Sequence, residues 1–286
     1  MIGRIMKRLI PKAYKEIHCT INIVNQNNLL KNRCALITGG TSGIGLSIAE
    51  AFLKSGADVI ITGRDEYKLN TTINKLSKIS SDSIVCGYVL DSLKPETFDA
   101  IFNEILNDLH SLGRSKVDIL VNNSGVNGPK MPYATIEEYD IIMNTNLRGT
   151  YFMSQMVGLY FIRNKIKGNI LNIASASSLR PADSPYTLSK WGIRGLTMGL
   201  AKSLGNYGIT VNGIAPGPTA TPMMRNDSKG NVALGRTMFG RYILPEEIAN
   251  MAIVLTSDVG RSIMGDVIYM TGGAGNLTFD DVKYHF

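Results

Sequence analysis

Residues 34–53 read CALITGGTSGIGLSIAEAFL, and this stretch decides the fold. A short apolar run leads into a glycine-rich turn at 38–45, and apolar residues with helical spacing follow the turn. Glycines at a strand-to-helix junction allow a tight turn, and the next helix then presents free N–H groups and a positive dipole end to a pyrophosphate. The stretch therefore predicts the first strand and helix of a dinucleotide-binding fold. The residues expected to contact the cofactor here are Gly39, Thr41, Ser42, Gly43, Ile44 and Gly45.

The glycines of this turn follow the spacing GxxxGxG, which differs from the commoner Rossmann pattern GxGxxG. A glycine cluster alone also fits an ordinary turn with a close helix contact. Its position directly after the first strand of a βαβ series favours the dinucleotide interpretation, although it does not identify the chemistry.

Short β-branched runs alternate with longer amphipathic stretches along the rest of the chain. Strands joined through helices form right-handed crossovers and a parallel sheet with helices on both faces. The sequence thus predicts a Rossmann-type, doubly wound α/β fold with about seven strands in a single domain over 31–286. The predicted strands are 35–38, 59–62, 84–90, 119–122, 170–173, 210–214 and 267–270. The helix-length segments include 45–54, 136–163 and 185–206.

The 30 basic residues exceed the 23 acidic ones, and the excess lies in residues 1–33, which hold seven basic residues and one acidic residue. A nucleic-acid binder would carry its basic residues on the folded surface, so nucleic acid is not an expected partner. Residues 1–30 are expected to form a basic extension. Contact with an anionic membrane is one interpretation of it, and a frayed tail or a strap across a neighbouring subunit is the favoured one.

The three cysteines, Cys19, Cys34 and Cys86, include no CxxC pair, and two of them lie in apolar runs that resemble buried strands. This pattern disfavours zinc ligation and a disulfide framework. The sequence also lacks the long apolar run of a membrane span and the uninterrupted apolar region of a signal peptide. A cytoplasmic location is therefore expected.

The chemistry is indicated by SASSLRPADSPYTLSK at 175–190. Tyr186 and Lys190, four residues apart, share one face of a helix, and a neighbouring ammonium favours the phenolate that a general acid/base needs. Ser175 ends the preceding strand and supplies a hydroxyl donor. A tyrosine four residues before a lysine also occurs as a surface aromatic beside a solvated lysine. Placement after a buried strand, at the ligand-binding edge of such sheets, favours the catalytic interpretation.

With these residues the chain resembles the compact, single-domain branch of the short-chain dehydrogenase/reductase superfamily, over about residues 31–273. The matching motifs are TGGTSGIG at 38–45, NNSG at 122–125, the Asn in NTNLRG at 144–149, the Ser in NIAS at 172–175, YTLSK at 186–190, NGIAPGPTAT at 212–221 and LPEEIA at 244–249. The resemblance implies an oxidoreductase that interconverts a carbonyl and a secondary alcohol with a nicotinamide cofactor and without a metal.

The resemblance also implies a role for each catalytic position. Tyr186 would exchange the proton with the carbonyl oxygen, and Ser175 would hydrogen-bond the same oxygen. Lys190 would lower the pKa of the phenol and hold the nicotinamide ribose. Asn146 would break its helix and seat a water that links Lys190 to solvent. Among the cofactor contacts, Asn122 and Gly125 would lie against the adenosine half, Asp91 near the adenine, and Pro216, Gly217, Thr219 and Thr221 beside the nicotinamide.

The end of the second predicted strand indicates a preference for NADP(H), with NAD(H) possible. NAD enzymes place an acid at this tip to bind the ribose 2′-hydroxyl, whereas NADP enzymes omit it and offer an arginine to the 2′-phosphate. Here Gly63 occupies the tip and Arg64 follows. Asp65 is expected to cap the helix that begins at Glu66. The competing interpretation is that Asp65 turns inward and serves NAD.

The sequence departs from the family pattern at three places. Ser124 stands where NNAG is usual, the interval from Ser175 to Tyr186 is about two residues short, and the usual C-terminal DGG is TGG at 271–273. The short interval leaves Ser177 and Ser178 as competitors for the catalytic hydroxyl. None of the departures removes a catalytic group.

Residues 218–242 occupy the place of the family's substrate lid, and their cations, Arg225, Lys229, Arg236 and Arg241, suit an anionic or polyhydroxylated small-molecule substrate. A solvated loop with a structural Arg241 is the equally weighted alternative. The resemblance implies a homotetramer assembled through 136–163 and 185–206, with a dimer second, and apolar residues on more than one face of these segments agree with burial on both sides. Rival functions are a dehydratase or epimerase of the extended branch and a non-catalytic dinucleotide-sensing protein.

Overall fold

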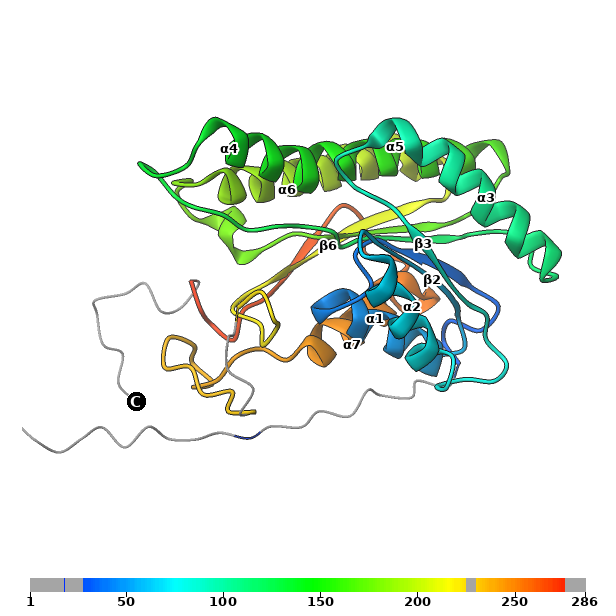
Figure 1. The fold of residues 1–286 in the computed structure, drawn as a ribbon, viewed down its shortest axis with the longest axis horizontal. Coiled ribbons are helices and arrows are strands. Elements are labelled where there is room, and N and C mark those ends of the chain that lie inside the picture. Colours follow the sequence, from blue (N-terminus) through cyan, green and yellow to red (C-terminus); the bar gives the residue numbers. More distant parts are fainter. Residues whose placement is uncertain (1–17, 19–27, 225–229, 276–286) are drawn as a thin grey trace, which may run out of the picture.

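A computed structural model describes residue 18 and residues 28–224 and 230–275 of the chain. Seven strands form one parallel sheet in the order β3-β2-β1-β4-β5-β6-β7 (Figure 1). The expected doubly wound fold is confirmed. The strands are β1 (Cys34–Ile37), β2 (Asp58–Gly63), β3 (Val85–Val89), β4 (Ile119–Asn122), β5 (Asn169–Ile173), β6 (Thr210–Pro216) and β7 (Val267–Met270).

Helices cover both faces of the sheet (Figure 1). On one face lie α1 (Gly43–Lys54), α2 (Glu66–Leu76) and α7 (Pro245–Thr256); on the other lie α3 (Phe98–Ser111), α4 (Ile136–Met143), α5 (Gly149–Arg163) and α6 (Pro185–Leu204). Successive side chains of a strand point to opposite faces, so β1 contributes Ile37 to one core with Phe52 and Leu36 to the other with Phe161.

The chain changes direction in the sheet at β1. Strands β1 to β3 extend the sheet to one side, and β4 then returns to pair with the free edge of β1. Ligands of open α/β sheets bind outside the carboxyl ends of the strands at such a switch point. The loops that follow β1 and β4 therefore lie where ligands bind in folds of this kind.

The segment expected as one helix over 136–163 is interrupted. Helix α4 ends at Met143, residues Asn144–Arg148 form one π-helical turn, and α5 begins at Gly149. Such turns are rare and are frequently found at functional sites. The expected helix break around Asn146 is thus present, although the periodicity of the apolar residues alone predicted a continuous helix.

The end of the expected N-terminal extension packs against the sheet domain. Leu30 is fully buried in the core beneath α1, and its N–H donates a 3.0 Å hydrogen bond to the carbonyl oxygen of Ser55. The remainder of the extension, and with it the predicted membrane contact, lies outside the described residues apart from residue 18. No helix in the described part of the chain is long and apolar enough to cross a membrane.

Candidate active site

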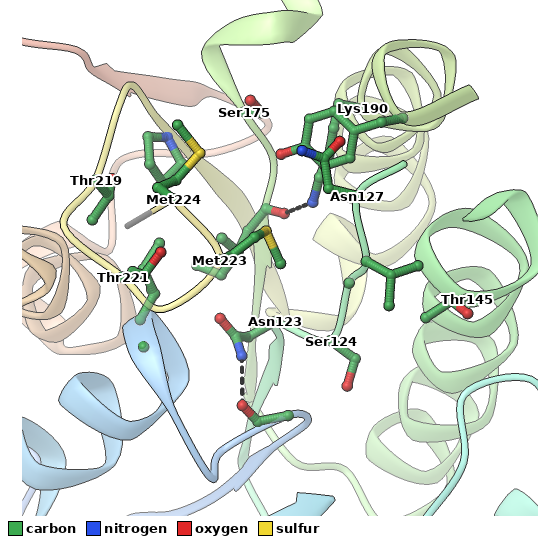
Figure 2. Close-up of a pocket in the computed structure, with 18 of the residues that line it drawn as sticks. Asn123, Ser124, Asn127, Thr145, Ser175, Lys190, Thr219, Thr221, Met223 and Met224 are labelled. Atoms are coloured by element: carbon green, nitrogen blue, oxygen red, sulfur yellow. Dashed lines mark hydrogen bonds between the residues drawn. The ribbon is translucent and has the colours of Figure 1, made fainter. Parts of the chain in front are cut away.

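A cleft of about 840 Å³ runs along the carboxyl ends of the strands (Figure 2). It is lined by the turn after β1, the tip of β2, and the loops that follow β4, β5 and β6. Fifteen of the eighteen predicted catalytic and cofactor-binding residues line it: Gly39, Thr41, Ser42, Gly43, Ile44, Arg64, Asp91, Gly125, Ser175, Tyr186, Lys190, Pro216, Gly217, Thr219 and Thr221.

Gly45, Asn122 and Asn146 do not line the cleft in the described structure. Asn122 is buried, and its amide donates to Ser154 Oγ at 2.8 Å and to Asn172 Oδ1 at 2.9 Å. The neighbouring Asn123 lines the cleft in its place. Gly45 is buried in the first turn of α1, where a side chain would collide with Asn123.

Asn123 hydrogen-bonds the backbone of the glycine-rich turn. Its amide donates hydrogen bonds of 3.0 and 2.9 Å to the carbonyl oxygens of Thr38 and Gly39, and one bond of this amide is drawn in Figure 2. Gly39 and Gly43 have φ values of 65° and 55°, a region that favours glycine. The Ser124 hydroxyl lies 3.0 Å from where a Cβ of Gly39 would be, so a small residue is needed at both positions.

The start of α1 suits a pyrophosphate. Its N-cap residue, Ser42, makes no side-chain capping bond, and no acidic residue lies in the first turn. The N–H groups there keep hydrogen-bonding capacity beside the positive end of the helix dipole. The donors and the glycine cradle both fit the phosphates of a dinucleotide.

The far end of the cleft carries two cations at the tip of β2. Arg64 and Lys68 both line it, while Asp65 accepts a 2.9 Å hydrogen bond from the Lys68 N–H and caps α2, as expected. A Cβ at Gly63 would lie 2.8 Å from Thr41 Cγ2, so this tip has little room for an acidic side chain. The sequence interpretation missed Lys68, whose signal was its place three residues after the capping Asp65.

The predicted catalytic pair, Tyr186 and Lys190, stands at the start of α6. Ser184 caps the helix by accepting a 3.2 Å hydrogen bond from the Thr187 N–H, and Pro185 occupies the first helical position, where its missing N–H costs nothing. The cap places Tyr186 in the first turn and Lys190 one turn later on the same face. The Lys190 ammonium lies 5.7 Å from the centroid of the Tyr186 ring.

Burial dominates the pKa values of the pair. It lowers the pKa of Lys190 to about 8, because the charged ammonium lies in the interior with its Nζ donating a 2.8 Å hydrogen bond to the Ile173 carbonyl oxygen. Burial raises the pKa of Tyr186, and a hydrogen bond with Ser175 opposes that rise.

The three serines after β5 differ in their surroundings. Ser175 Oγ accepts a 3.1 Å hydrogen bond from the Ser177 N–H and meets Tyr186. Ser178 is fully buried, donates to the Ser175 carbonyl oxygen at 2.8 Å and lies 3.1 Å from the Tyr269 hydroxyl. Ser178 thus supports the loop from below, whereas Ser175 and Ser177 line the cleft.

Asn146 lies behind the catalytic pair in the π-helical turn. Its amide donates to the Val126 carbonyl oxygen at 2.9 Å and to Ser189 Oγ at 3.1 Å, and its Oδ1 accepts from the Val126 N–H at 2.8 Å. A Cβ at Gly125 would lie 3.3 Å from Asn146 Oδ1 and 3.8 Å from Lys190 Nζ. Both side chains therefore flank the same backbone segment.

The substrate end of the cleft is both apolar and cationic. Met223 and Met224 project into it after β6, and Asn127 also lines it (Figure 2). Arg236 and Arg180 also line it, and Arg180 was not singled out from the sequence. Its signal was its position in the loop between the catalytic serine and tyrosine.

The remaining cations of the expected lid divide into two groups. Arg241 forms a bidentate ion pair with Glu247, at 2.8 and 3.0 Å, and donates to the Tyr242 carbonyl oxygen, so the structural interpretation of this arginine is confirmed. Arg225 and Lys229 lie outside the described residues.

Comparison with known proteins gives concordant matches. The sequence pattern of the short chain dehydrogenase family matches residues 33–231. A (2S)-[(R)-hydroxy(phenyl)methyl]succinyl-CoA dehydrogenase subunit of Thauera aromatica is 35% identical, over 85% of this chain and 97% of that protein. Among solved structures, a variant actinorhodin polyketide ketoreductase with NADPH is 29% identical, with a TM-score of 0.76 over 85% of this chain and 97% of that one. A 3-ketoacyl-(acyl-carrier-protein) reductase of Brucella melitensis complexed with NADH is 30% identical, with a TM-score of 0.75 over 86% and 99%.

Proposed function

This chain belongs to the short-chain dehydrogenase/reductase superfamily and is an oxidoreductase of CH–OH and carbonyl groups, and we propose that it works with NADP(H) and with Tyr186 as its general acid/base. The observation that carries the proposal is the meeting of Ser175, Tyr186 and Lys190 in the cleft that the glycine-rich turn also lines. The glycine cradle and the unblocked start of α1 fit the dinucleotide.

The bound nicotinamide supplies or accepts the hydride. In the reducing direction Tyr186 donates its phenolic proton to the carbonyl oxygen, and Ser175 hydrogen-bonds the same oxygen. Both side chains line the cleft, and the hydrogen bond between them holds the phenol in position before the substrate arrives. Burial keeps Tyr186 protonated, which suits a proton donor.

Lys190 has two roles in the proposal. Its ammonium is fixed by the Ile173 carbonyl oxygen, and its remaining N–H groups can bind the ribose hydroxyls of the cofactor. A pKa of about 8 also lets Lys190 lose and regain a proton near neutral pH, so it can return a proton to Tyr186 after each turnover. Asn146, which like Lys190 lies beside Gly125, would connect this lysine to solvent.

The preference for NADP(H) rests on charge and space at the tip of β2. Arg64 and Lys68 line the cleft there and can bind a 2′-phosphate through charge-assisted hydrogen bonds. Asp65 is occupied as the cap of α2, which removes the acid that would serve an NAD ribose. NAD(H) as the preferred cofactor is the alternative, and the relative complexed with NADH keeps it open.

We also propose a cytoplasmic homotetramer that acts on a small-molecule substrate. Free thiols at Cys34 and Cys86 agree with a reducing compartment. The exposed apolar side chains of α5 and α6 support assembly through these helices. They include Tyr151, Phe152, Leu159, Leu188, Trp191 and Met198, each at least 39% exposed.

The experiment that tests the function follows the absorbance of the reduced nicotinamide. Purified full-length chain is incubated with NADPH or NADH and a panel of oxo acids, oxo esters, cyclic ketones and oxo sugars. Turnover that is faster with NADPH and lost in Tyr186→Phe supports the proposal. Binding of the dinucleotide without turnover of any carbonyl compound, and of any alcohol in the reverse direction, would favour a non-catalytic sensor.

A further inference from the structure

The charges at the substrate end of the cleft come from four lining residues within the described part of the chain: Lys130, Arg180, Asp183 and Arg236. Lys130 Nζ and Asp183 Oδ2 form an ion pair of 2.8 Å, and the Met131 N–H donates to the Asp183 carbonyl oxygen at 2.9 Å. These two loops therefore neutralise each other's charge. Arg180 and Arg236 are the other two cations among these lining residues.

Arg180 is fixed by its backbone and by its packing. The Trp191 indole donates a 2.9 Å hydrogen bond to the Arg180 carbonyl oxygen, which ties the loop to α6. A Cβ at Gly275 would lie 3.1 Å from Arg180 Nε and 3.3 Å from Cζ, so the guanidinium packs directly on this glycine. A guanidinium carries five N–H donors and can serve a protein group and a ligand together.

Arg236 lies on a neighbouring loop that contacts the same C-terminal turn. The loop is closed by a 2.8 Å hydrogen bond from the Leu234 N–H to the Gly240 carbonyl oxygen, and the Met238 N–H donates to Gly272 at 2.8 Å. The turn at 271–275 thus lies between Arg236's loop and Arg180. Both arginines line the cleft, and the turn contacts the guanidinium of Arg180 and the loop that carries Arg236.

The rest of this end is poor in competing charge. Asp183 is the one carboxylate among the described lining residues there, and it is paired with Lys130. Met223 and Met224 contribute apolar surface beside the arginines. A cation next to apolar surface interacts with an anion more strongly than it would in bulk water.

Resting on the proposed oxidoreductase function, we infer that the substrate carries an oxyanion, a carboxylate or a phosphate, which Arg180 and Arg236 bind while its carbonyl lies at Ser175 and Tyr186. Guanidinium groups match both oxyanions with paired, charge-assisted hydrogen bonds. The inferred class is an oxo acid or oxo phosphate, or the corresponding hydroxy compound, whose anionic group is separated from the reacting carbon.

The test compares matched pairs of substrates that differ only in the anion. Oxo acids are paired with their methyl esters, and oxo phosphates with the parent oxo alcohols, each at several chain lengths. One charge-assisted hydrogen bond changes affinity by about 10- to 100-fold, so kcat/KM for the charged member should exceed that of the neutral member by about this factor. The acid and phosphate arms separate the two oxyanions.

The variants Arg236→Gln and Arg180→Gln test whether these two side chains bind the anionic group of the substrate. Each should raise KM for the charged member by about tenfold and leave the neutral member unchanged. Arg180→Lys keeps the positive charge and is the control for any disturbance of the packing on Gly275 in Arg180→Gln. Its KM for the charged member should rise less than that of Arg180→Gln. Lys78→Gln, which removes an exposed cation beyond the end of α2, is the control and should change neither member.

Two negative outcomes remain distinct. Equal kcat/KM for charged and neutral members, or equal losses for both in Arg236→Gln, would overturn the inference and leave the oxidoreductase function intact. Absence of turnover for every pair with both nicotinamides would overturn the proposed function, and the inference with it. Binding of NADPH, followed by quenching of Trp191 fluorescence, should be unchanged in Arg236→Gln in every case.

Discussion

Lys190 donates a 2.8 Å hydrogen bond to the carbonyl oxygen of Ile173, the last residue of β5. This contact fixes the ammonium of α6 at the carboxyl end of the sheet. It also keeps a charged group in the interior, which costs stability. The proposed catalytic arrangement and the stability of the fold thus both depend on the Lys190 side chain.

The stability of the protein should reflect that cost. The folded pKa of Lys190, about 8, lies below its unfolded value of 10.5, so the unfolded chain binds an additional proton between these values. The contribution of Lys190 to stability therefore increases as pH rises from 8 to 10.5 and is least favourable below pH 8. Between about pH 7 and 10.5, wild type should gain about 3 kcal/mol relative to Lys190→Met.

Urea unfolding of wild type and Lys190→Met across this pH range measures the difference. The comparison cancels the titration of the other tyrosines and lysines, because both proteins share them. A difference in unfolding free energy that does not change with pH would show that the Lys190 pKa is unperturbed.

Removing the phenolic hydroxyl should affect chemistry more than binding. Tyr186→Phe keeps the ring in place but removes the proton donor, so kcat should fall by about 10² or more. The Kd for NADPH should stay nearly unchanged, since the ring still packs in the first turn of α6. Stopped-flow turnover and fluorescence titration measure the two quantities, and near-normal kcat in Tyr186→Phe would contradict the assignment.

The cofactor preference should depend on the two cations at the tip of β2. Arg64→Ala should lower kcat/KM with NADPH by about 10- to 100-fold and leave kcat/KM with NADH nearly unchanged. Lys68→Ala should act in the same direction with a smaller effect, because lysine makes no bidentate contact. Lys54→Ala, an exposed cation at the other end of α1, is the control. Equal losses with both nicotinamides would mean that Arg64 does not bind the 2′-phosphate.

Two truncations should have different consequences at the N-terminus. Deletion of residues 1–27 keeps the buried Leu30 and should leave the folded core intact. Deletion of residues 1–30 also removes Leu30, which should cost about 2–5 kcal/mol, the usual range for a truncated core leucine. Thermal unfolding of both truncations measures this. Equal stability of the two would show that the contact of Leu30 with the core contributes little.

Assembly should depend on the exposed aromatic surface of α5. Phe152 is 40% exposed and packs edge-to-face on Tyr151, with the ring centroids 5.3 Å apart. Phe152→Glu should convert a tetramer into smaller species, because a charge would be buried in the contact. Light scattering after gel filtration gives the mass, with Tyr67→Glu, on the exposed face of α2, as control. A tetramer that persists in Phe152→Glu would place the interface elsewhere.

The sheet could be predicted from the sequence because its signals are local. The predicted strands 119–122 and 267–270 agree with β4 and β7 at both ends. The glycine-rich turn specified the first βα unit, and Pro185 with Ser184 fixed the start of α6. Where local signals conflicted, as at the π-helical turn around Asn146, apolar periodicity predicted the wrong continuous helix.

The site could be predicted less completely than the sheet, because whether a residue lines the cleft depends on the direction in which its side chain points. Asn122 and Asn123 are adjacent, and alternation along β4 turns the first into the core and the second into the cleft. Lys68 in α2 and Arg180 in the loop after β5 line the same cleft because the fold brings these segments, which are distant in sequence, to one edge of the sheet. No sequence pattern near residue 30 predicted that Leu30 is buried or that its N–H donates to the Ser55 carbonyl oxygen.

The bonds between Asn123 and the glycine-rich turn also have a consequence for synthesis of the protein. Asn123 N–H reaches Thr38 Oγ1 at 3.0 Å, across 85 residues of sequence. A nascent chain that has left the ribosome only as far as β3 contains the turn, but β1 still has an unpaired edge. Such long-range pairing is slow, and the exposed edge is prone to aggregation until β4 emerges. The glycine-rich turn can therefore form these hydrogen bonds only in chains that have grown past Asn123.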